Sequence, residues 1–385
     1  MAKYLKETNN RISLPKLLVS LGSIAATVAI LVWMPTGFGA QTAAATVKHS
    51  DFRMGRELAA YVEEAVRLEP LAETELPEKV QTVYRLKDED LVAPKPDPER
   101  FGTAQDPAQL KDLLEEAKGL LEGQQTLFTA ETVIKEGSTV HYYLDETIFA
   151  VTWKQVEEEC VYTMTEVKVA HPSQFRRFFA GGEYGSGTLY TTTQMSESVN
   201  AVAAASGDYH GYRRFGVVVN NGKVYRSRSQ FLDTCYVDEN GDLLFVYAAD
   251  TGTEEETQKY VDENNIRFSL SFGPVMILDG QVCVPRRYNS GEINEPYARA
   301  ALCQMGKLHY VVVTANTEKP HYSMHTVRSF AENLCRMGIP TAYALDGGQT
   351  ASIVMNNELI NNVSYGSQRQ ISDILYFATA IPSEG

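Results

Sequence analysis

The sequence predicts an α+β fold class: a strand-rich, mixed-sheet domain with packed helices, preceded by a single transmembrane helix and a helical stalk. A basic N-terminus and a run of uncharged residues come first, and apolar residues at helical spacing follow. From about residue 138 onward, β-branched and aromatic residues dominate and the apolar period shortens to that of strands. These changes divide the chain into a tail (1–16), an anchor (17–35), a stalk (36–135) and a main domain (136–385).

The anchor is predicted from the uncharged run Leu17–Met34, which has about the length that a helix needs to cross a bilayer. Lys3, Lys6 and Arg11 precede it, so the positive-inside rule places the N-terminus in the cytoplasm and the main domain outside the cell. A signal peptide cleaved near Ala43 is the alternative. The apolar run is longer than the usual core of a signal peptide, which favours a retained single-pass anchor in the cell membrane.

The stalk is predicted from two helical patterns separated by a polar, proline-containing segment. Apolar residues recur at helical spacing over 51–69 and again over 107–122. The prolines within 70–106 exclude a helix interior or a central strand there. We expect these helices to hold the main domain off the membrane, and to pair with each other or dock on that domain.

In the main domain, the short apolar period predicts strands, and hairpin turns fall at Asn221-Gly222 and within 236–246. Helical spacing predicts three helices, the last of which ends at Gly338, a residue type typical of helix C-termini. The strands are expected over 140–144, 148–153, 160–170, 215–220, 223–226, 272–278, 308–314, 358–363 and 371–380, and the helices over 193–204, 250–268 and 321–337.

The most informative stretch is 339–355, where an apolar strand ends at Asp346. Gly347 and Gly348 follow directly, and Ile353–Met355 resumes the apolar pattern. Asp-Gly and Gly-Gly are strong hairpin signals, so the local pattern alone favours a hairpin turn. A carboxylate at the end of a buried strand, beside backbone without side chains, also suits a reactive centre.

Composition excludes some classes of function. A formal net charge of -14 argues against nucleic-acid binding, which needs a basic surface. His321 and His325 are spaced to share a metal ion, but no third ligand is evident, so neither a metal nor another cofactor is expected. The 5 cysteines lack the close spacing of a zinc or iron–sulfur site, and an odd number leaves at least one free thiol; one or two disulfides remain open.

The C-terminal half carries a series of features in a fixed order. Arg299 precedes an apolar strand, a helix ends at Gly338, and then Tyr343–Gly348, Asn361-Asn362 and Arg369 follow. Over roughly residues 160–380 this order resembles the phosphodiester glycosidase family, whose mammalian member is the N-acetylglucosamine-1-phosphodiester α-N-acetylglucosaminidase. Bacterial members often follow a single N-terminal membrane anchor, as is predicted for this chain.

The resemblance implies hydrolysis of the bond between a sugar C1 and a phosphodiester. Such an enzyme needs a carboxylate near the oxocarbenium-like centre and cations that hold the phosphate. Asp346 is the candidate catalytic carboxylate, with Asp208 as its partner. The candidate substrate-binding residues are Arg299 and Arg369 for the phosphate, Gly347 and Gly348 for anion-binding amides, and Asn361 and Asn362 for sugar hydroxyls.

The sequence also departs from the family's pattern near Asp346. Ala344 replaces an Asn, Gln349 replaces a third Gly, and Thr350-Ala351 replaces Ser-Ser; the upstream loop Ser206–Tyr209 replaces a usual Asn-Gly-Gly. Two functions therefore remain. One is an extracellular, membrane-anchored hydrolase that acts on sugar-phosphate links of surface or exported glycans. The other is a catalytically inactive glycan or sugar-phosphate-binding domain on the same scaffold.

Overall fold

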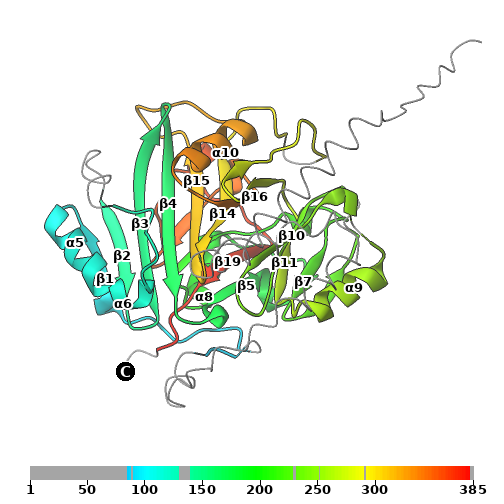
Figure 1. Cartoon of the computed structure of the whole chain (residues 1–385), viewed down its shortest axis with the longest axis horizontal. Helices are drawn as coiled ribbons and strands as arrows, with labels where there is room; N and C mark the ends of the chain where they lie inside the picture. Colours follow the sequence, from blue (N-terminus) through cyan, green and yellow to red (C-terminus); the bar gives the residue numbers. More distant parts are fainter. Residues whose placement is uncertain are drawn as a thin grey trace, which may run out of the picture. The chain divides into compact units, whose positions relative to one another are not determined.

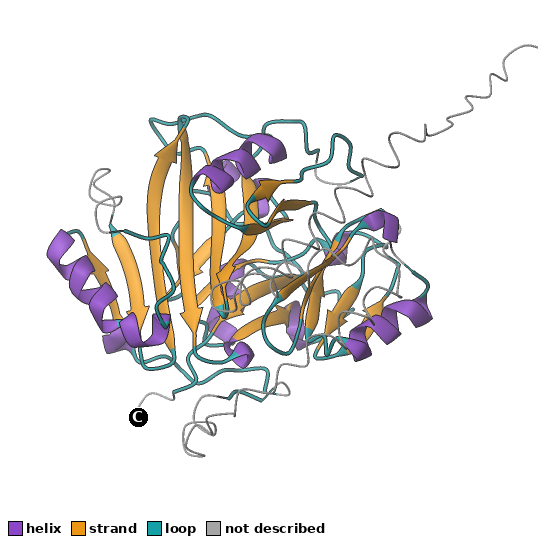
Figure 2. Cartoon of the chain, viewed as in Figure 1, coloured by secondary structure: helices purple, strands orange, loops and turns teal. Residues whose placement is uncertain are grey.

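Three antiparallel sheets form the framework of the protein in the computed structural model (Figures 1 and 2). The structure describes residues 85–87, 90–129, 139–228, 231–250, 252–289 and 292–381. The predicted tail and anchor and the helix predicted over 51–69 lie outside these residues. Within them, no helix is both long enough and apolar enough to cross a membrane. The α+β prediction is confirmed, and every strand pair that the structure describes is antiparallel.

The largest sheet has nine strands, and chain segments far apart in the sequence lie side by side in it. β15 and β14 form a hairpin whose outer partners are β4 and β16. In spatial order the strands are β1 (Phe101–Ala104), β2 (Val140–Leu144), β3 (Ile148–Glu157), β4 (Cys160–Val169), β15 (His309–Asn316), β14 (Arg299–Gly306), β16 (Thr341–Leu345), β12 (Val275–Leu278) and β13 (Gln281–Val282).

Two five-stranded sheets pack against one face of this large sheet. The first runs β18 (Glu358–Leu359), β17 (Ile353–Met355), β6 (Ala203–Ser206), β19 (Asp373–Phe377) and β5 (Phe175–Phe179). The second runs β10 (Leu243–Val246), β9 (Thr234–Val237), β11 (Phe268–Leu270), β7 (Val218–Asn220) and β8 (Lys223–Arg226). Phe175 joins the three sheets, because its ring lies 4.6 Å from that of Tyr310 and 5.2 Å from that of Phe268.

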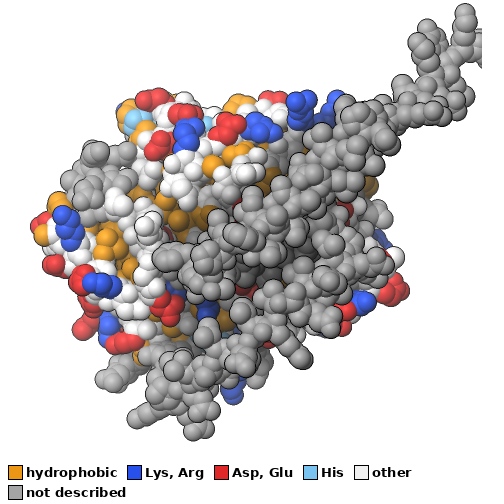
Figure 3. Space-filling model, in the orientation of Figure 1, with side chains coloured by type: hydrophobic (Ala, Val, Ile, Leu, Met, Phe, Trp, Pro, Cys, Tyr) orange, Lys and Arg blue, Asp and Glu red, His pale blue; other side chains and the backbone are white. Residues whose placement is uncertain are grey.

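Helices cover the outer faces of the sheets. α5 (Pro107–Glu116), α6 (Lys118–Leu121) and α10 (Val327–Arg336) pack on the other face of the large sheet, where Leu110 and Phe330 enter one core with Trp153 (Figure 1). α8 (Thr192–Ser198) covers the first small sheet, and α9 (Glu254–Glu263) covers the second. On the face shown in Figure 3, acidic and basic side chains intermingle among apolar ones.

The predicted stalk boundary at residue 135 is wrong for the described part of that segment. β1 pairs with β2, with Phe101 opposite Tyr143, and Leu110 is fully buried. Further upstream, the Ala93 amide donates to the Val199 carbonyl (3.1 Å). The apolar side chains at helical spacing over 107–122 pack on the large sheet. The folded domain therefore includes this segment and begins before residue 101.

Three predicted helices are shorter than expected. The helix predicted over 250–268 spans only Glu254–Glu263, and Phe268 already belongs to β11. The helix predicted over 193–204 ends at Ser198, because Asn200 takes a left-handed conformation (φ 56°) and the small residues that follow form β6, a strand between two neighbours. The helix predicted over 321–337 begins only at Val327. Its start is set by Thr326, whose side chain caps the helix by accepting from the Ser329 amide (3.1 Å).

The hairpin that the local pattern favours at Gly347-Gly348 is also wrong. β16 belongs to the nine-stranded sheet and β17 to a five-stranded sheet, and the two strands do not pair. The turn after Asp346 therefore carries the chain from one sheet to another. The two glycines allow the tight turn by which the chain passes between the sheets. Asp346 lies where the sheets meet.

Candidate functional site

Asp346 lies directly after β16 and is only partly exposed. The two glycines that follow it let the chain turn tightly against the start of β14. A Cβ on Gly347 would lie 2.5 Å from the Ala298 carbonyl oxygen, and Gly348 has a left-handed φ of +66° and donates its amide to that same oxygen (2.8 Å). The Gly348 amide is thus occupied, which corrects its predicted role in an anion-binding pair of amides; for Gly347 that role stays a prediction.

The Asp346 carboxyl is largely shielded from water and lies close to charged side chains. Burial raises its pKa to about 7, against the opposing influence of Arg213 and Arg369. The Thr350 hydroxyl donates to the Gly347 carbonyl oxygen (2.7 Å) and also reaches the Asp346 carboxyl. A carboxyl with a pKa near neutrality can be present in both protonation states at physiological pH, which is typical of groups that take part in acid–base catalysis.

Asp208 follows β6, and only 3% of its surface is exposed. One carboxylate oxygen accepts from Arg213 (2.8 Å) and from the Tyr209 amide (2.6 Å), and the other accepts from the Ser271 amide (2.9 Å). Burial disfavours its charged form, but Arg213 and Arg177 outweigh burial and hold the pKa of Asp208 below its ordinary value. Asp208 lies near enough to Asp346 for its charge to act on that carboxyl. Both of its own oxygens already accept hydrogen bonds from the protein.

Behind Asp208 lies a second buried ion pair, which the sequence did not reveal. Asp373, the first residue of β19, accepts from the Arg177 Nε (2.7 Å) and from the Asp208 amide (3.0 Å). Burial raises the pKa of Asp373 to about 6, and Arg177 partly opposes this. His210 Nε2 lies 3.7 Å from Asp373, and burial lowers the pKa of His210 to about 3, so its imidazole is neutral. This network fixes the loop that follows β6.

Arg213 is the functional candidate that sequence reasoning missed. Asp208 holds its guanidinium, whose carbon also lies 5.2 Å from the Phe272 ring centroid and 5.6 Å from that of Tyr209. Its charge acts on Asp346. The available signal was its place in the polar, glycine-bounded loop after Asp208, five residues further along the chain.

Arg369 lies at the same centre, as its charge also acts on Asp346. Its guanidinium carbon is 4.6 Å from the Tyr212 ring centroid and 5.7 Å from that of Tyr209, and these two rings stack with centroids 4.9 Å apart. The Tyr212 hydroxyl donates to the Gln370 carbonyl (2.8 Å). The loop after β6 and the loop before β19 are therefore fastened together beside Asp346.

Arg299 has a structural task in the folded chain. Its Nε donates to the His325 carbonyl (2.9 Å), and its Nη2 donates to the Glu292 carbonyl (3.2 Å) and to the Glu295 carbonyl. Burial lowers its pKa to about 10. These contacts fix the segment that leads into β14 and supports Gly347; a direct phosphate contact stays a prediction.

The two asparagines predicted to bind sugar differ in exposure. Asn361 is buried; its Oδ1 accepts from the Ile353 amide (2.7 Å), and its Nδ2 donates to the Ala351 carbonyl (2.8 Å). Asn362 is exposed, and its Nδ2 donates to the Thr317 carbonyl (2.6 Å). Both asparagines hold the loop after β18 to its surroundings, and their contact with a sugar stays a prediction.

Three of the residues that depart from the family's pattern and Thr350 have the following places in the structure. Ala344 is buried in the core beneath α10, and Ala351 is buried in the core between the sheets. The Gln349 side chain donates to the Ser367 carbonyl (3.1 Å), and Thr350 supplies the hydroxyl beside Asp346.

Neither the histidines nor the cysteines form a metal site among the residues that the structure describes. His321 pairs with Glu159 (3.0 Å), whereas His325 is buried beneath the Tyr162 ring. The five cysteines are free thiols, of which Cys160, Cys235 and Cys303 are buried. The three buried cysteines pack as apolar side chains in the cores.

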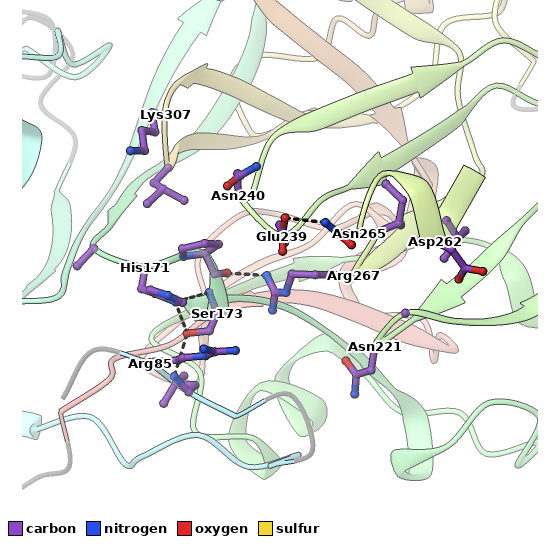
Figure 4. Close-up of a pocket in the computed structure, with 17 residues that line it drawn as sticks. Arg85, His171, Ser173, Asn221, Glu239, Asn240, Asp262, Asn265, Arg267 and Lys307 are labelled. Atoms are coloured by element: carbon purple, nitrogen blue, oxygen red, sulfur yellow. Dashed lines mark hydrogen bonds between the residues drawn. The ribbon is translucent and has the colours of Figure 1, made fainter. Parts of the chain in front are cut away.

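A separate pocket of about 790 Å³ lies among the β7–β8, β9–β10 and β14–β15 turns and the connection from β4 to β5 (Figure 4). Its walls are polar: Arg267 donates to the Pro172 carbonyl (2.6 Å), and Asn265 donates to Glu239 (2.7 Å), so these side chains are engaged with the protein. None of the predicted site residues lines this pocket. We place the candidate site at Asp346, where a titratable carboxyl and two arginines come together.

The fold and this centre define a class of protein: a β-rich domain with a partly buried, titratable carboxyl on which two arginine charges act. Residues 199–378 match the family model described as phosphodiester glycosidase, and this match confirms the resemblance predicted from the sequence for that part of the chain. The match includes Asp208, Arg213, Asp346 and Arg369.

Similar proteins are distant. The SPbeta prophage-derived uncharacterized protein YomE of Bacillus subtilis (strain 168) is 22% identical over 256 residues, which cover 64% of this chain and 38% of that protein. The chain thus spans about two fifths of the length of this relative. The catalytic domain of zebrafish N-acetylglucosamine-1-phosphodiester alpha-N-acetylglucosaminidase, auto-inhibited by its pro-peptide, gives a TM-score of 0.49 at 14% identity, covering 76% of this chain and 99% of that chain. A hypothetical protein from Synechocystis gives 0.43 at 12%, covering 60% and 62%.

Proposed function

We propose that this domain hydrolyses the bond between C1 of a sugar and a phosphodiester on surface or exported glycans. The observation that carries the proposal is the Asp346 carboxyl, partly buried where three sheets meet, with the charges of Arg213 and Arg369 acting on it. The family match over residues 199–378 supports the same reaction class.

In the proposed reaction, the leaving group is a phosphate monoester, which departs readily without a proton. The protein then needs a carboxylate that stabilises the oxocarbenium-like centre or directs a water to it, and we assign this role to Asp346. Arg213 and Arg369 hold the phosphate oxygens, because a guanidinium can pair with two oxygens at once. Their positive charge also stabilises the negative charge that the leaving group gains as the bond breaks.

Asp208 takes a different role from the catalytic one that the sequence suggested. Its carboxylate oxygens are buried and engaged with Arg213, the Tyr209 amide and the Ser271 amide. We assign it as a positioning residue that orients Arg213. Because Asp208 stays ionised, it also balances part of the positive charge of Arg213, so it tunes the field at Asp346.

The proposal includes an extracellular, membrane-anchored location. It is supported by the basic N-terminus and by the uncharged run Leu17–Met34 that follows it. In that arrangement the domain faces polysaccharides outside the cell.

The test is hydrolysis of a panel of sugar 1-phosphodiesters by the purified full-length chain, with free sugar as the readout. Asp346→Asn keeps the shape of the side chain but removes its charge, so we expect at least a hundredfold lower turnover. Asp279→Asn is the matched control, because Asp279 lies in an exposed turn with φ 51°, a conformation that Asn tolerates. Saturable binding of the panel without release of sugar would show the inactive binding domain instead.

A further inference from the structure

The pocket shown in Figure 4 lies at the end of the large sheet opposite to Asp346. At one end of β14, Ala300 pairs with Leu345, the residue before Asp346; at the other end, Lys307 follows the strand and lines the pocket. At about 3.3 Å per residue, the chain from Ala300 to Lys307 spans roughly 23 Å. The pocket is therefore separate from the candidate site, and its volume of about 790 Å³ is in the range of sites for small ligands.

Hydrogen bonds fix one wall of this pocket. The Leu86 amide donates to the Ser173 hydroxyl (2.9 Å), which places Arg85, the preceding residue, beside the connection from β4 to β5. The Arg267 Nη1 donates to the Pro172 carbonyl (2.6 Å) on the same connection. Three segments far apart in the sequence are thus held together here (Figure 4). A wall that is already ordered loses little conformational entropy when a ligand binds.

His171 contributes a hydrogen-bond donor to the same wall. Its Nδ1 accepts from the Ser173 amide (3.1 Å) and lies 2.8 Å from the Ser173 hydroxyl oxygen (Figure 4). A ring nitrogen that accepts from an amide carries no proton, so the proton of the imidazole is on Nε2. The ring thus offers an N–H group to its surroundings, as the guanidinium groups of Arg85 and Arg267 do.

Cationic side chains outnumber carboxylates among the described residues that line the pocket. Arg85, Arg267 and Lys307 are the cations, and Glu239 and Asp262 are the acids. Within the described part of the chain, no hydrogen bond or ion pair joins the side chains of Arg85 and Lys307 to the protein, and both residues are exposed. The local balance is positive although the whole chain has a formal net charge of -14. A hollow with a positive balance raises the local concentration of anions.

The remaining lining residues suit a ligand that is rich in hydroxyl groups. Asn221 and Asn240 line the pocket from the β7–β8 and β9–β10 turns, and an amide side chain both donates and accepts hydrogen bonds, as a sugar hydroxyl does. Glu239 and Asp262 add carboxylate acceptors. None of the lining residues that the structure describes is Phe, Tyr or Trp, so a ligand held by stacking on such a ring is not indicated.

We propose that this pocket binds an anionic sugar, that is, a saccharide unit that carries a phosphate or a carboxylate group. Arg85 and Lys307 supply the charge that attracts the anionic group, and the asparagines of the two turns bind the hydroxyls. Bond cleavage at Asp346 has no part in this binding. The inference therefore goes beyond the proposed function and is tested separately from it.

Calorimetric titration of the full-length chain with glucose 6-phosphate, glucuronate and glucose tests the pocket. We expect saturable binding of at least one of the two anionic sugars, with glucose bound at least about tenfold more weakly because it makes no charge-assisted hydrogen bonds to the cations. Binding of only one anionic sugar identifies the anionic group that the pocket takes. Failure of both to bind, or an equal affinity for glucose, would overturn the proposal.

Two variants and two controls locate the binding. Arg85→Ala and Lys307→Ala remove exposed cations and should each weaken the affinity about tenfold. Lys111→Ala, on the exposed side of α5, should leave the affinity unchanged, and so should Arg369→Ala, which removes a cation at the Asp346 centre. Unchanged affinity in either pocket variant, or an equal loss in Lys111→Ala, would refute the assignment. A loss confined to Arg369→Ala would place the binding at Asp346 and would refute it as well.

Discussion

Replacing Asp346 by asparagine should stabilise the protein at alkaline pH, although it should lower turnover at least a hundredfold. The carboxyl has its pKa raised from 3.8 to about 7 by burial, against the pull of Arg213 and Arg369. A raised carboxyl pKa means that the folded state binds the proton more tightly than the unfolded state does. The stability that this proton contributes is complete below about pH 4, falls as the pH rises toward 7, and is gone above it.

The size of the effect follows from the shift. A difference of about 3 pKa units corresponds to at most about 4 kcal/mol between the protonated and ionised forms. Between pH 5 and pH 8, about 2.5 kcal/mol of this should be lost by the wild type. Asp346→Asn has no proton to lose at this position, so its stability advantage over the wild type should grow by that amount across the same interval.

The assay is urea unfolding of the two full-length proteins at pH 5, 6, 7 and 8, with Asp279→Asn as the reference for an exposed carboxyl. Since all other titrating groups are shared, the difference between the variant and the wild type isolates Asp346. A difference that stays constant across this interval would refute the reasoning. Such a constant difference would mean that the two arginines offset burial and that the folded-state pKa of Asp346 lies below this interval.

Four further outcomes follow from the structure. The kcat/KM of the wild type should rise as the pH increases through about 7, because the proposed reaction uses the ionised form of Asp346; a rate profile measures this. Arg213→Lys and Asp208→Asn should each lower kcat/KM about tenfold, and the double variant should lose little more, because Asp208 acts through Arg213. Leu110→Ala should lower the free energy of unfolding by about 3 kcal/mol, measured with urea, because this side chain of α5 is fully buried in the core against the large sheet. Gly347→Ala should destabilise the protein by about 1–3 kcal/mol and reduce turnover, because the new Cβ meets a backbone carbonyl.

Each of these outcomes has a control or a result that opposes it. A flat or falling rate profile near pH 7 would reject the ionised carboxylate as the active form. Additive losses in the double variant would mean that Asp208 has a task apart from Arg213. Lys111→Ala, on the exposed side of α5, should change stability by less than about 0.5 kcal/mol. Gly119→Ala should stabilise by about 1 kcal/mol, because it lies in α6 with no atom within 4 Å of its new Cβ.

Much of the strand framework was predictable from the sequence, because its signals are local. β2 and β4 appeared as alternating β-branched and aromatic residues, and the Asn221-Gly222 turn joins β7 to β8 as expected. The sheet to which each strand belongs was not predictable. In isolation, Gly347-Gly348 has the sequence of a hairpin turn. In the structure β16 pairs with β14 and β17 pairs with β6, so the turn connects two different sheets.

Site residues could be predicted from the sequence where a local pattern marked them. They could not be predicted where their role depends on contacts between distant segments of the chain. Asp346 stood out as a carboxylate between a strand and glycines, and Arg369 followed from the family's order. Arg213 and the Arg177–Asp373 pair did not, because their roles depend on contacts between β5, β19 and the loop after β6. A buried ion pair leaves no periodic pattern in the sequence.

The structure also changes how the protein should be prepared. A fragment that begins at residue 136 would lack β1, α5 and α6, and the loss of Leu110 would expose the core around Trp153. It would also lose Phe128, whose amide, like that of Leu127, donates to the buried Glu166 carboxylate. The full-length chain is therefore the proper material for every measurement proposed.

The position of bond cleavage tests the central claim most directly. Hydrolysis of a sugar 1-phosphodiester in ¹⁸O-labelled water separates attack at C1 from attack at phosphorus, and phosphorus NMR reads the isotope in the released phosphate monoester. Our account predicts an unlabelled phosphate monoester, because the new oxygen goes to the sugar. A labelled phosphate would show that the protein cleaves the P–O bond, and it would contradict the role assigned to Asp346.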